Sequence, residues 1–198
     1  MTGWTGRAHV AGASRLSFKA LIVLSLVGGA LGALLLLITP SSFFERLVPY
    51  LVLFATALFT WGSFGGQREA SARLGSLGTG VAQLMIAIYG GYFGGGIGFL
   101  MLAALTAAGM QLRAAGATKN VLAAVMNASA VAIFIFSPQV HWTEAGITAA
   151  GAITGGLAGG LLMQRVNERA LRVGIVIIGV ALTVCLFLRA HGILFARG

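Results

Sequence analysis

Acidic residues are nearly missing from this chain of 198 residues. Aspartate is absent, and glutamate occurs at four positions only, Glu45, Glu69, Glu144 and Glu168. Charged residues of both signs make up 9% of the sequence, whereas ordinary soluble domains contain about 25%. This shortage argues against a soluble globular domain.

Residue types that carry catalysis or bind metals are also scarce. Cysteine occurs once, at Cys185, so neither a disulfide framework nor a thiolate metal site is available. The three histidines are far apart in the sequence, at positions 9, 141 and 191. The apolar runs contain no Ser/His arrangement, paired carboxylates or set of metal ligands. We therefore expect no enzyme activity, no metal and no cofactor.

Hydrophobic residues, in contrast, make up 58% of the chain. Several apolar runs reach the roughly 20 residues that a helix needs to cross a bilayer. The sequence therefore predicts an all-α, polytopic helical membrane protein whose surroundings are lipid. Its net charge of +9 comes from Lys and Arg beside the apolar runs. Such residues are typical of cytoplasmic loops that face anionic lipid, so no nucleic-acid partner is needed.

The apolar runs divide the chain into a tail and two unequal parts. Residues 1–17 are polar and basic, lack a signal-peptide core, and are predicted to form an N-terminal tail. Residues 18–64 hold two spans, 18–38 and 47–64, with Pro49 in the first turn of the second, where its missing N–H is harmless. A cytoplasmic linker is expected at 65–76. Residues 77–190 are predicted to contain an apolar hairpin at 77–110 and spans at 117–136, 144–163 and 170–188.

Loop charges indicate that the 77–110 stretch returns to the side of the membrane it left. The tail and the linker are basic and lie on the cytoplasmic side under the positive-inside rule. The same rule places 111–119 and 165–172 inside, and 137–143, which has no Lys or Arg, outside. A stretch of 34 residues between two cytoplasmic segments must therefore turn back within the bilayer.

Two glycine-rich segments suggest an internal repeat. "VGGALGALL" at 27–35 and "TGGLAGGLL" at 154–162 align their glycines at an offset of 127 residues. Chance is the alternative, because small residues four apart are a common helix-packing device. With the loop charges, the two copies run in opposite directions, as in the inverted repeats of secondary transporters. A partner for the glycine cluster at 89–98 would fall before Met1, so residues 18–64 correspond to the end of a first repeat.

Six glycines crowd the segment "YGGYFGGGIGFL", residues 89–100. Backbone polar groups can leave helical hydrogen bonding in a membrane only where protein or a water-filled cavity covers them. We expect a bend here, with Gly94, Gly95, Gly96 and Gly98 baring amides at the positive end of a half-helix, which suits an anion. The alternative is that these glycines only allow close helix crossing.

The following span adds polar side chains that could orient an anion. Asn120 and Asn127 are seven residues apart and share a helix face, and Lys119 offers a positive charge. Lys119 could instead extend its ammonium group to the membrane surface. Three further residues are weaker candidates. For Tyr89 and Tyr92, an interfacial or packing role is simpler. For Gln83, a hydrogen bond to a neighbouring helix is simpler.

The ordered motifs resemble a known family. "AIYGGYFGGGIGFLMLAAL", "ATKNVLAAVMNASAVAIFIFSPQVHW" and "GAITGGLAGGLL" resemble the second half of the sulfite exporter (TauE/SafE) family of bacterial permeases. "VGGALGALLLLITPSSFFERLVPYLVLFATALF" resembles the end of its first half. The resemblance implies a multi-pass protein of the bacterial plasma membrane that exports a small, sulfur-containing anion such as sulfite or a sulfonate by alternating access. The sequence is also compatible with a homo-oligomer.

The chain departs from the family pattern at two points. The first glycine-rich motif is missing, and the proline that often follows the motif is replaced by "LMLAAL". The first departure motivates an alternative function, a non-transporting fragment or membrane assembly subunit. The second leaves anion binding to the backbone amides.

Overall fold

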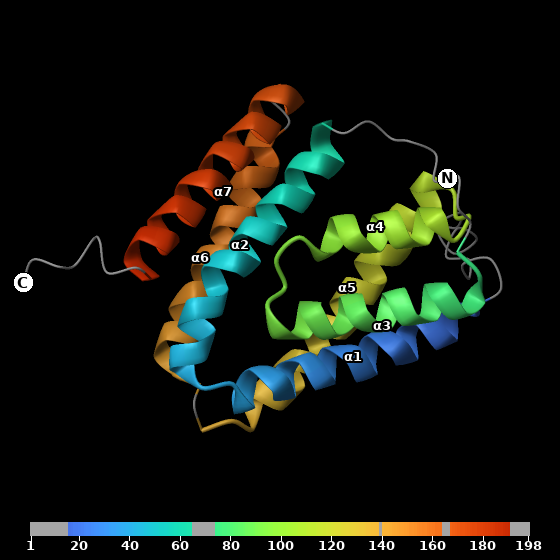
Figure 1. Cartoon of the computed structure of the whole chain (residues 1–198), viewed down its shortest axis with the longest axis horizontal. Coiled ribbons are helices and arrows are strands. Elements are labelled where there is room, and N and C mark those ends of the chain that lie inside the picture. The colour runs from blue at the N-terminus through green and yellow to red at the C-terminus, as the bar shows by residue number, and fades with distance from the viewer. Residues whose placement is uncertain (1–15, 65–73, 139, 164–166, 191–198) are drawn as a thin grey trace, which may run out of the picture.

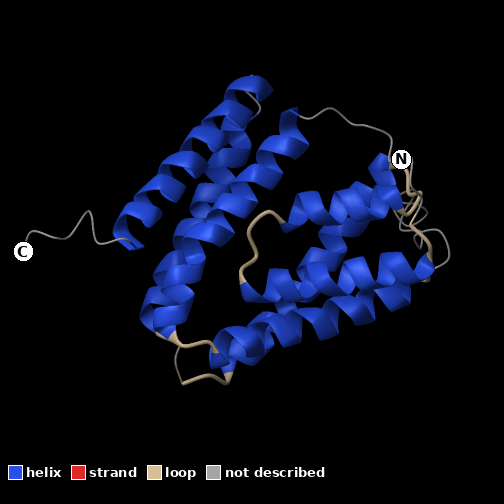
Figure 2. Cartoon of the chain, viewed as in Figure 1, coloured by secondary structure: helices blue, strands red, loops and turns tan. Residues whose placement is uncertain are grey.

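The computed structural model describes residues 16–64, 74–138, 140–163 and 167–190. Within these ranges the chain is helical and contains no strand (Figures 1 and 2). Most of the predicted tail and most of the predicted linker lie outside the described residues. The helices are α1 Phe18–Ile38, α2 Ser41–Phe64, α3 Ser76–Tyr92, α4 Ile97–Ala107, α5 Leu112–Ile135, α6 Trp142–Met163 and α7 Glu168–Ala190.

Four of these helices are long and apolar enough to cross a membrane: α1, α2, α5 and α7. The prediction of a polytopic helical membrane protein is thus confirmed. The bounds of α1 are those predicted, because Ser17 caps its first turn through a 3.2 Å hydrogen bond that the Ala20 amide donates to the hydroxyl oxygen. The predicted span at 144–163 also forms a helix, α6.

The start of α2 was predicted wrongly. The helix begins at Ser41, not at residue 47, because the Pro40 carbonyl accepts the amides of Phe43 and Phe44 at 3.0 Å and so starts the first turn. Pro49 therefore lies inside the helix and not in its first turn. A proline there removes one backbone hydrogen bond from the helix. The α5 helix likewise begins earlier than predicted, at Leu112.

The long apolar stretch breaks where its glycines are densest. α3 ends at Tyr92 and α4 begins at Ile97, so residues 93–96 separate the two helices. The far ends of the hairpin meet again, because the Leu74 amide before α3 donates a 2.9 Å hydrogen bond to the carbonyl of Ala107, the last residue of α4. The prediction that this stretch turns back on itself is confirmed, and Figure 1 shows α3 and α4 joined by the open loop.

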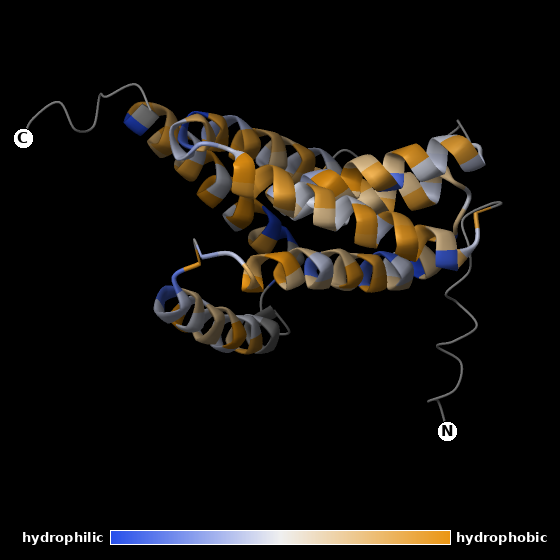
Figure 3. Ribbon diagram, turned by 90° about the horizontal axis from the view of Figure 1, so that it is seen from below, coloured by the Kyte–Doolittle hydropathy of each residue, from blue (hydrophilic) through white to orange (hydrophobic). Residues whose placement is uncertain are grey.

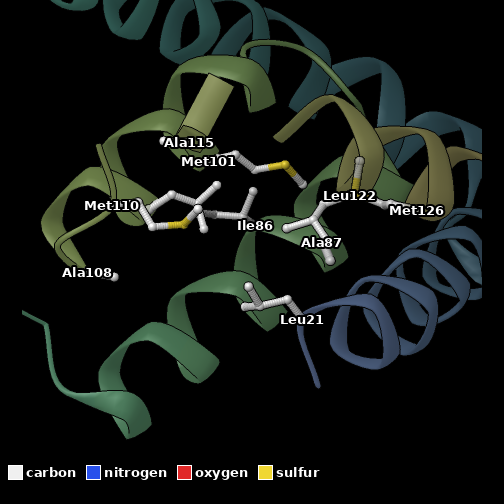
Figure 4. Packing of buried hydrophobic residues seen from close by; sticks show 10 residues of the cluster. Leu21, Ile86, Ala87, Met101, Ala108, Met110, Ala115, Leu122 and Met126 are labelled. Atoms are coloured by element: carbon white, nitrogen blue, oxygen red, sulfur yellow. The ribbon is translucent and has the colours of Figure 1, made fainter. Parts of the chain in front are cut away.

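The buried core lies among α1, α3, α4 and α5. Figure 4 shows its side chains meeting from all four helices. None of the core cluster comes from α2, α6 or α7. Its members are Leu21, Ile86, Ala87, Met101, Leu105, Ala108, Met110, Ala115, Leu122 and Met126. These helices form one packed unit, and the candidate site lies at its edge.

Glycines let α1 approach α3 and α5 closely. A Cβ on Gly28 would lie 3.0 Å from the Leu84 carbonyl oxygen, and one on Gly29 would lie 2.6 Å from the Met126 carbonyl oxygen. Such contacts are how small residues hold membrane helices together. Gln83, only 1% exposed, donates a 2.8 Å hydrogen bond to the hydroxyl of Ser25 on α1. The interpretation of Gln83 as a bond to a neighbouring helix is confirmed.

The remaining helices form a second group. α2 and α7 run antiparallel, with Gly179 against Thr56, and Arg172 donates a 2.8 Å hydrogen bond to the Ser63 carbonyl. The rings of Tyr50 and Phe187 meet edge to face at 5.0 Å. In contrast, α6 lies apart from the other helices (Figure 3) and makes no substantial contact with any described helix.

Candidate functional site

The break between α3 and α4 is a loop with an unusual backbone. Gly94 and Gly96 have φ angles of 79° and 76°, in the left-handed region that residues with a Cβ rarely occupy. The Phe93 amide still donates to the Tyr89 carbonyl at 2.9 Å, which closes α3. The four amides after that of Gly94 lead into α4 and belong to Gly95, Gly96, Ile97 and Gly98. Within the described chain, none of these four amides has a hydrogen-bond partner. The Gly94 amide, which was predicted to be bare as well, instead donates to the Tyr89 carbonyl at 3.4 Å.

These glycines line a cavity of about 430 Å³. The loop forms one wall, α2 forms a second, and α7 contributes Ile175 and Gly179. The wall from α2 consists of Val52, Ala55, Thr56 and Phe59. Its described lining is apolar except for the backbone and Thr56. Polar recognition in this cavity therefore depends mainly on main-chain groups.

Lys119 lies next to the loop. A Cβ placed on Gly98 would lie 3.4 Å from the Lys119 Nζ, so the ammonium group sits over the first turn of α4. The Lys119 side chain is half-buried and reaches this position from α5. The structure thus places Lys119 beside one of the four glycines that the sequence singled out, Gly98, although Lys119 is not among the residues that line the cavity. A positive charge lies near the amino end of a helix there, and both favour an anion.

The two predicted asparagines do not lie beside the glycine loop and Lys119. Asn120 and Asn127 both lie on an exposed side of α5, whereas the side that packs into the core carries Leu122 and Met126. They share one face of the helix, as predicted. That face points away from the packed unit, so the structure does not bring either amide to the glycine loop.

Two polar groups near the loop were undervalued by the sequence analysis. The hydroxyls of Tyr89 and Thr118 are buried without a hydrogen-bond partner in the described chain. Tyr89 lies in the last turn of α3 with its ring edge-on to Phe54 at 5.7 Å, and Thr118 precedes Lys119. No pattern in the sequence distinguishes them from packing residues. Tyr92, by comparison, donates a 3.4 Å hydrogen bond to the Thr39 hydroxyl and packs on Phe44, a structural role.

The fold and this site define a class: a multi-pass helical membrane protein with a glycine-broken hairpin whose loop lines a cavity. Comparison with known families gives the particular family. The family model for the sulfite exporter TauE/SafE matches residues 2–186. The chain belongs to the TauE/SafE family.

Two curated relatives show how much of such a protein this chain covers. A probable membrane transporter protein of Haemophilus influenzae is 28% identical over 159 residues, which are 79% of this chain and 62% of the relative. The probable membrane transporter protein YfcA of Escherichia coli K12 is 27% identical over 173 residues, 86% of this chain and 64% of the relative. The chain thus spans less than two thirds of the length of these relatives. No solved structure matches it significantly.

Proposed function

We propose that this protein takes part in the export of a small, sulfur-containing anion, such as sulfite or a sulfonate, across the bacterial plasma membrane. The anion binds at the loop between α3 and α4. Two observations carry the proposal: the amides from Gly95 to Gly98 have no hydrogen-bond partner in the described chain, and the Lys119 Nζ lies 3.4 Å from the Cβ position of Gly98. Membrane transport and not catalysis is the activity that such a site serves.

Charge and geometry support an anion as the ligand. The amides lie at the positive end of α4, where the helix dipole favours negative charge. No carboxylate lies among the described residues that line the cavity, so none of them places a like charge beside an anion. A sulfonate or sulfite offers several oxygens in a compact group, which matches several closely spaced N–H donors.

The division of the helices supports alternating access as the mechanism of the proposed transport. The loop belongs to the unit formed by α1, α3, α4 and α5, and the opposite cavity wall belongs to α2 and α7. A rocking motion between the two groups would open the cavity to one side and then to the other, as in transporters with inverted repeats. The names of the curated relatives, probable membrane transporter proteins, support the same function.

Replacing Lys119 with glutamine should lower the apparent affinity for the anion by roughly 10- to 100-fold. A charge-assisted hydrogen bond contributes about 1.5–3 kcal/mol, and each 1.4 kcal/mol is a factor of ten in binding. Uptake of radiolabelled sulfite, sulfate and a sulfonate into inverted vesicles measures the effect. Arg113→Gln is the control, because Arg113 is exposed at the start of α5. Equal affinities in the two variants would contradict the proposed role of Lys119.

Asn127 tests whether the exposed face of α5 also contributes. Asn127 is exposed on α5 and does not lie beside the loop, but an amide in the middle of a span needs a polar partner, and we propose that the passing anion is that partner. We therefore expect Asn127→Leu to impair flux more than Tyr92→Phe, because the Tyr92 hydroxyl has only the long bond to Thr39. Initial uptake rates at equal amounts of membrane-inserted protein decide the order. If Tyr92→Phe proves the more harmful, the anion path lies nearer α3 than α5.

A second function, that of an assembly subunit without transport activity of its own, is favoured by two observations. α6 lacks substantial contact with the other described helices, and the chain spans only 62–64% of its curated relatives. Vesicles that contain only this chain separate the functions. Anion flux in them supports transport by the chain alone, and flux that appears only with a further membrane polypeptide supports the subunit.

A further inference from the structure

The cavity beside the loop is larger than a compact oxyanion needs. Its volume of about 430 Å³ lies within the range of about 300–1,000 Å³ that is typical of sites for organic ligands. Sulfite, with one sulfur and three oxygen atoms, would fill a small part of this space. The rest of the cavity can therefore hold a further part of the ligand, and its walls indicate what that part is.

The walls that face the loop are apolar. α2 contributes Val52 and Phe59, and α7 contributes Ile175. Thr56 is the one polar side chain in the described lining, and it lies against α7, where a Cβ on Gly179 would be 2.6 Å from the Thr56 Oγ1. The described lining contains no Asp, Glu, Lys, Arg or His. Such walls favour contact with apolar groups and disfavour polar or charged groups that find no partner.

Two aromatic rings fix the shape of the cavity next to the loop. Phe59 and Phe99 both line it, and their rings meet edge to face with centroids 5.0 Å apart. A Cβ on Gly62 would lie 2.6 Å from the Phe99 Cδ1, so the Phe99 ring rests closely against α2. Phe99 directly follows the amides of residues 95–98 in the chain. An anionic head at these amides would therefore have apolar walls beside it.

We propose that the preferred ligand of this cavity is an organic sulfonate with an uncharged, apolar body, such as an alkyl or aryl group. The inference rests on the proposed function, because the loop amides hold the sulfonate head. The body then lies against Val52, Phe59 and Ile175. Inorganic sulfite leaves these walls uncovered, and the ammonium group of a zwitterionic aminosulfonate finds no carboxylate in the described lining. Both are therefore poorer ligands than an alkanesulfonate.

Propanesulfonate and aminoethanesulfonate test the character of the body, because they differ by a methyl group against an ammonium group at the same position. Isothermal titration of the full chain in nanodiscs, with titrations into empty nanodiscs subtracted, measures both affinities. We expect propanesulfonate to bind at least about 10-fold more tightly, since an unpaired charge in an apolar cavity is disfavoured. Along a series of alkanesulfonates, each buried methylene should raise the affinity by about three- to four-fold.

Variants on two walls locate the body. Ile175→Trp narrows the cavity from α7, and Val52→Phe narrows it from α2. We expect each to lower the affinity ratio of butanesulfonate to methanesulfonate from roughly 30-fold to below about 5-fold. The matched controls are Ile178→Trp and Leu53→Phe, whose native side chains are 61% and 47% exposed and do not line the cavity. These controls should keep the ratio, which also cancels any general loss of folded protein.

The inference and the transport proposal fail in different ways. Equal affinities for propanesulfonate and aminoethanesulfonate, or sulfite bound as tightly as butanesulfonate, would overturn the apolar body and leave the anion site intact. An equal fall of the ratio in wall variants and controls would place the body outside the cavity and overturn the inference as well. Butanol bound as tightly as butanesulfonate would instead contradict the anion site. Absence of binding by every probe would overturn both proposals.

Discussion

Replacing Gly96 with leucine should reduce anion flux to the level of vesicles without the protein, while the variant still inserts in the membrane. Gly96 has a φ of 76°, where a bulky residue costs about 1–2 kcal/mol. The new Cβ would also meet the Cα of Ala55 at 3.4 Å, inside the cavity. If the loop backbone relaxes, it moves the amides that we propose bind the anion. If the backbone stays in place, the leucine side chain covers these amides.

A matched control separates this effect from backbone strain alone. Gly109, after α4, has a φ of 89° and nothing within 4 Å of its Cβ position. Gly109→Leu therefore carries similar strain but does not touch the cavity, and we expect it to keep most of the flux. Radiolabelled sulfite uptake at equal protein density compares the two. Full flux in Gly96→Leu would refute the loop as the binding site.

Replacing Gly32 with leucine should destabilise the whole packed unit. A Cβ there would lie 2.7 Å from the Tyr92 backbone nitrogen and would also meet the Ile88 carbonyl. These are backbone atoms of α3 and cannot rotate away, so α1 must separate from α3. Overpacking costs about 1–3 kcal/mol and sometimes more. With about 2–4 °C per kcal/mol for a chain of this size, we expect the melting temperature in detergent to fall by roughly 5–10 °C.

The internal repeat provides the control for Gly32. Gly159 occupies the equivalent position of α6 and has nothing within 4 Å of its Cβ position. We expect Gly159→Leu to leave the melting temperature of the purified chain unchanged. A comparable fall in both variants would mean that leucine harms either helix irrespective of its neighbours, and the argument from close packing would fail.

Local signals predicted the parts of the fold that depend on a few adjacent residues. The bounds of α1 follow from the cap at Ser17 and the stop before Pro40. The break at 93–96 follows from the density of glycine, and the return of the hairpin from the basic loops on both sides of it. The contact of Leu74 with Ala107 is the physical result of that return.

Features that depend on helix rotation and tertiary packing were not predictable in the same way. A helical period places Asn120 and Asn127 on one face, but nothing local shows that Met126 and not Asn127 turns toward Gly29 and Gly90. The position of Lys119 beside Gly98 depends on the crossing of α4 and α5. The extra turns of α2 before Pro49 depend on the turn that Pro40 begins.

The shortness of the broken hairpin has an electrical consequence. α3 and α4 contain 17 and 11 residues, or about 25 and 16 Å of helix, against about 30 Å of hydrocarbon. An anion held at their junction would have crossed a large part of the insulating layer while still bound to protein. The membrane voltage contributes about 2.3 kcal/mol per charge per 100 mV. For the anion export that we propose, an interior-negative potential would therefore favour the outward movement of a singly charged anion through this site.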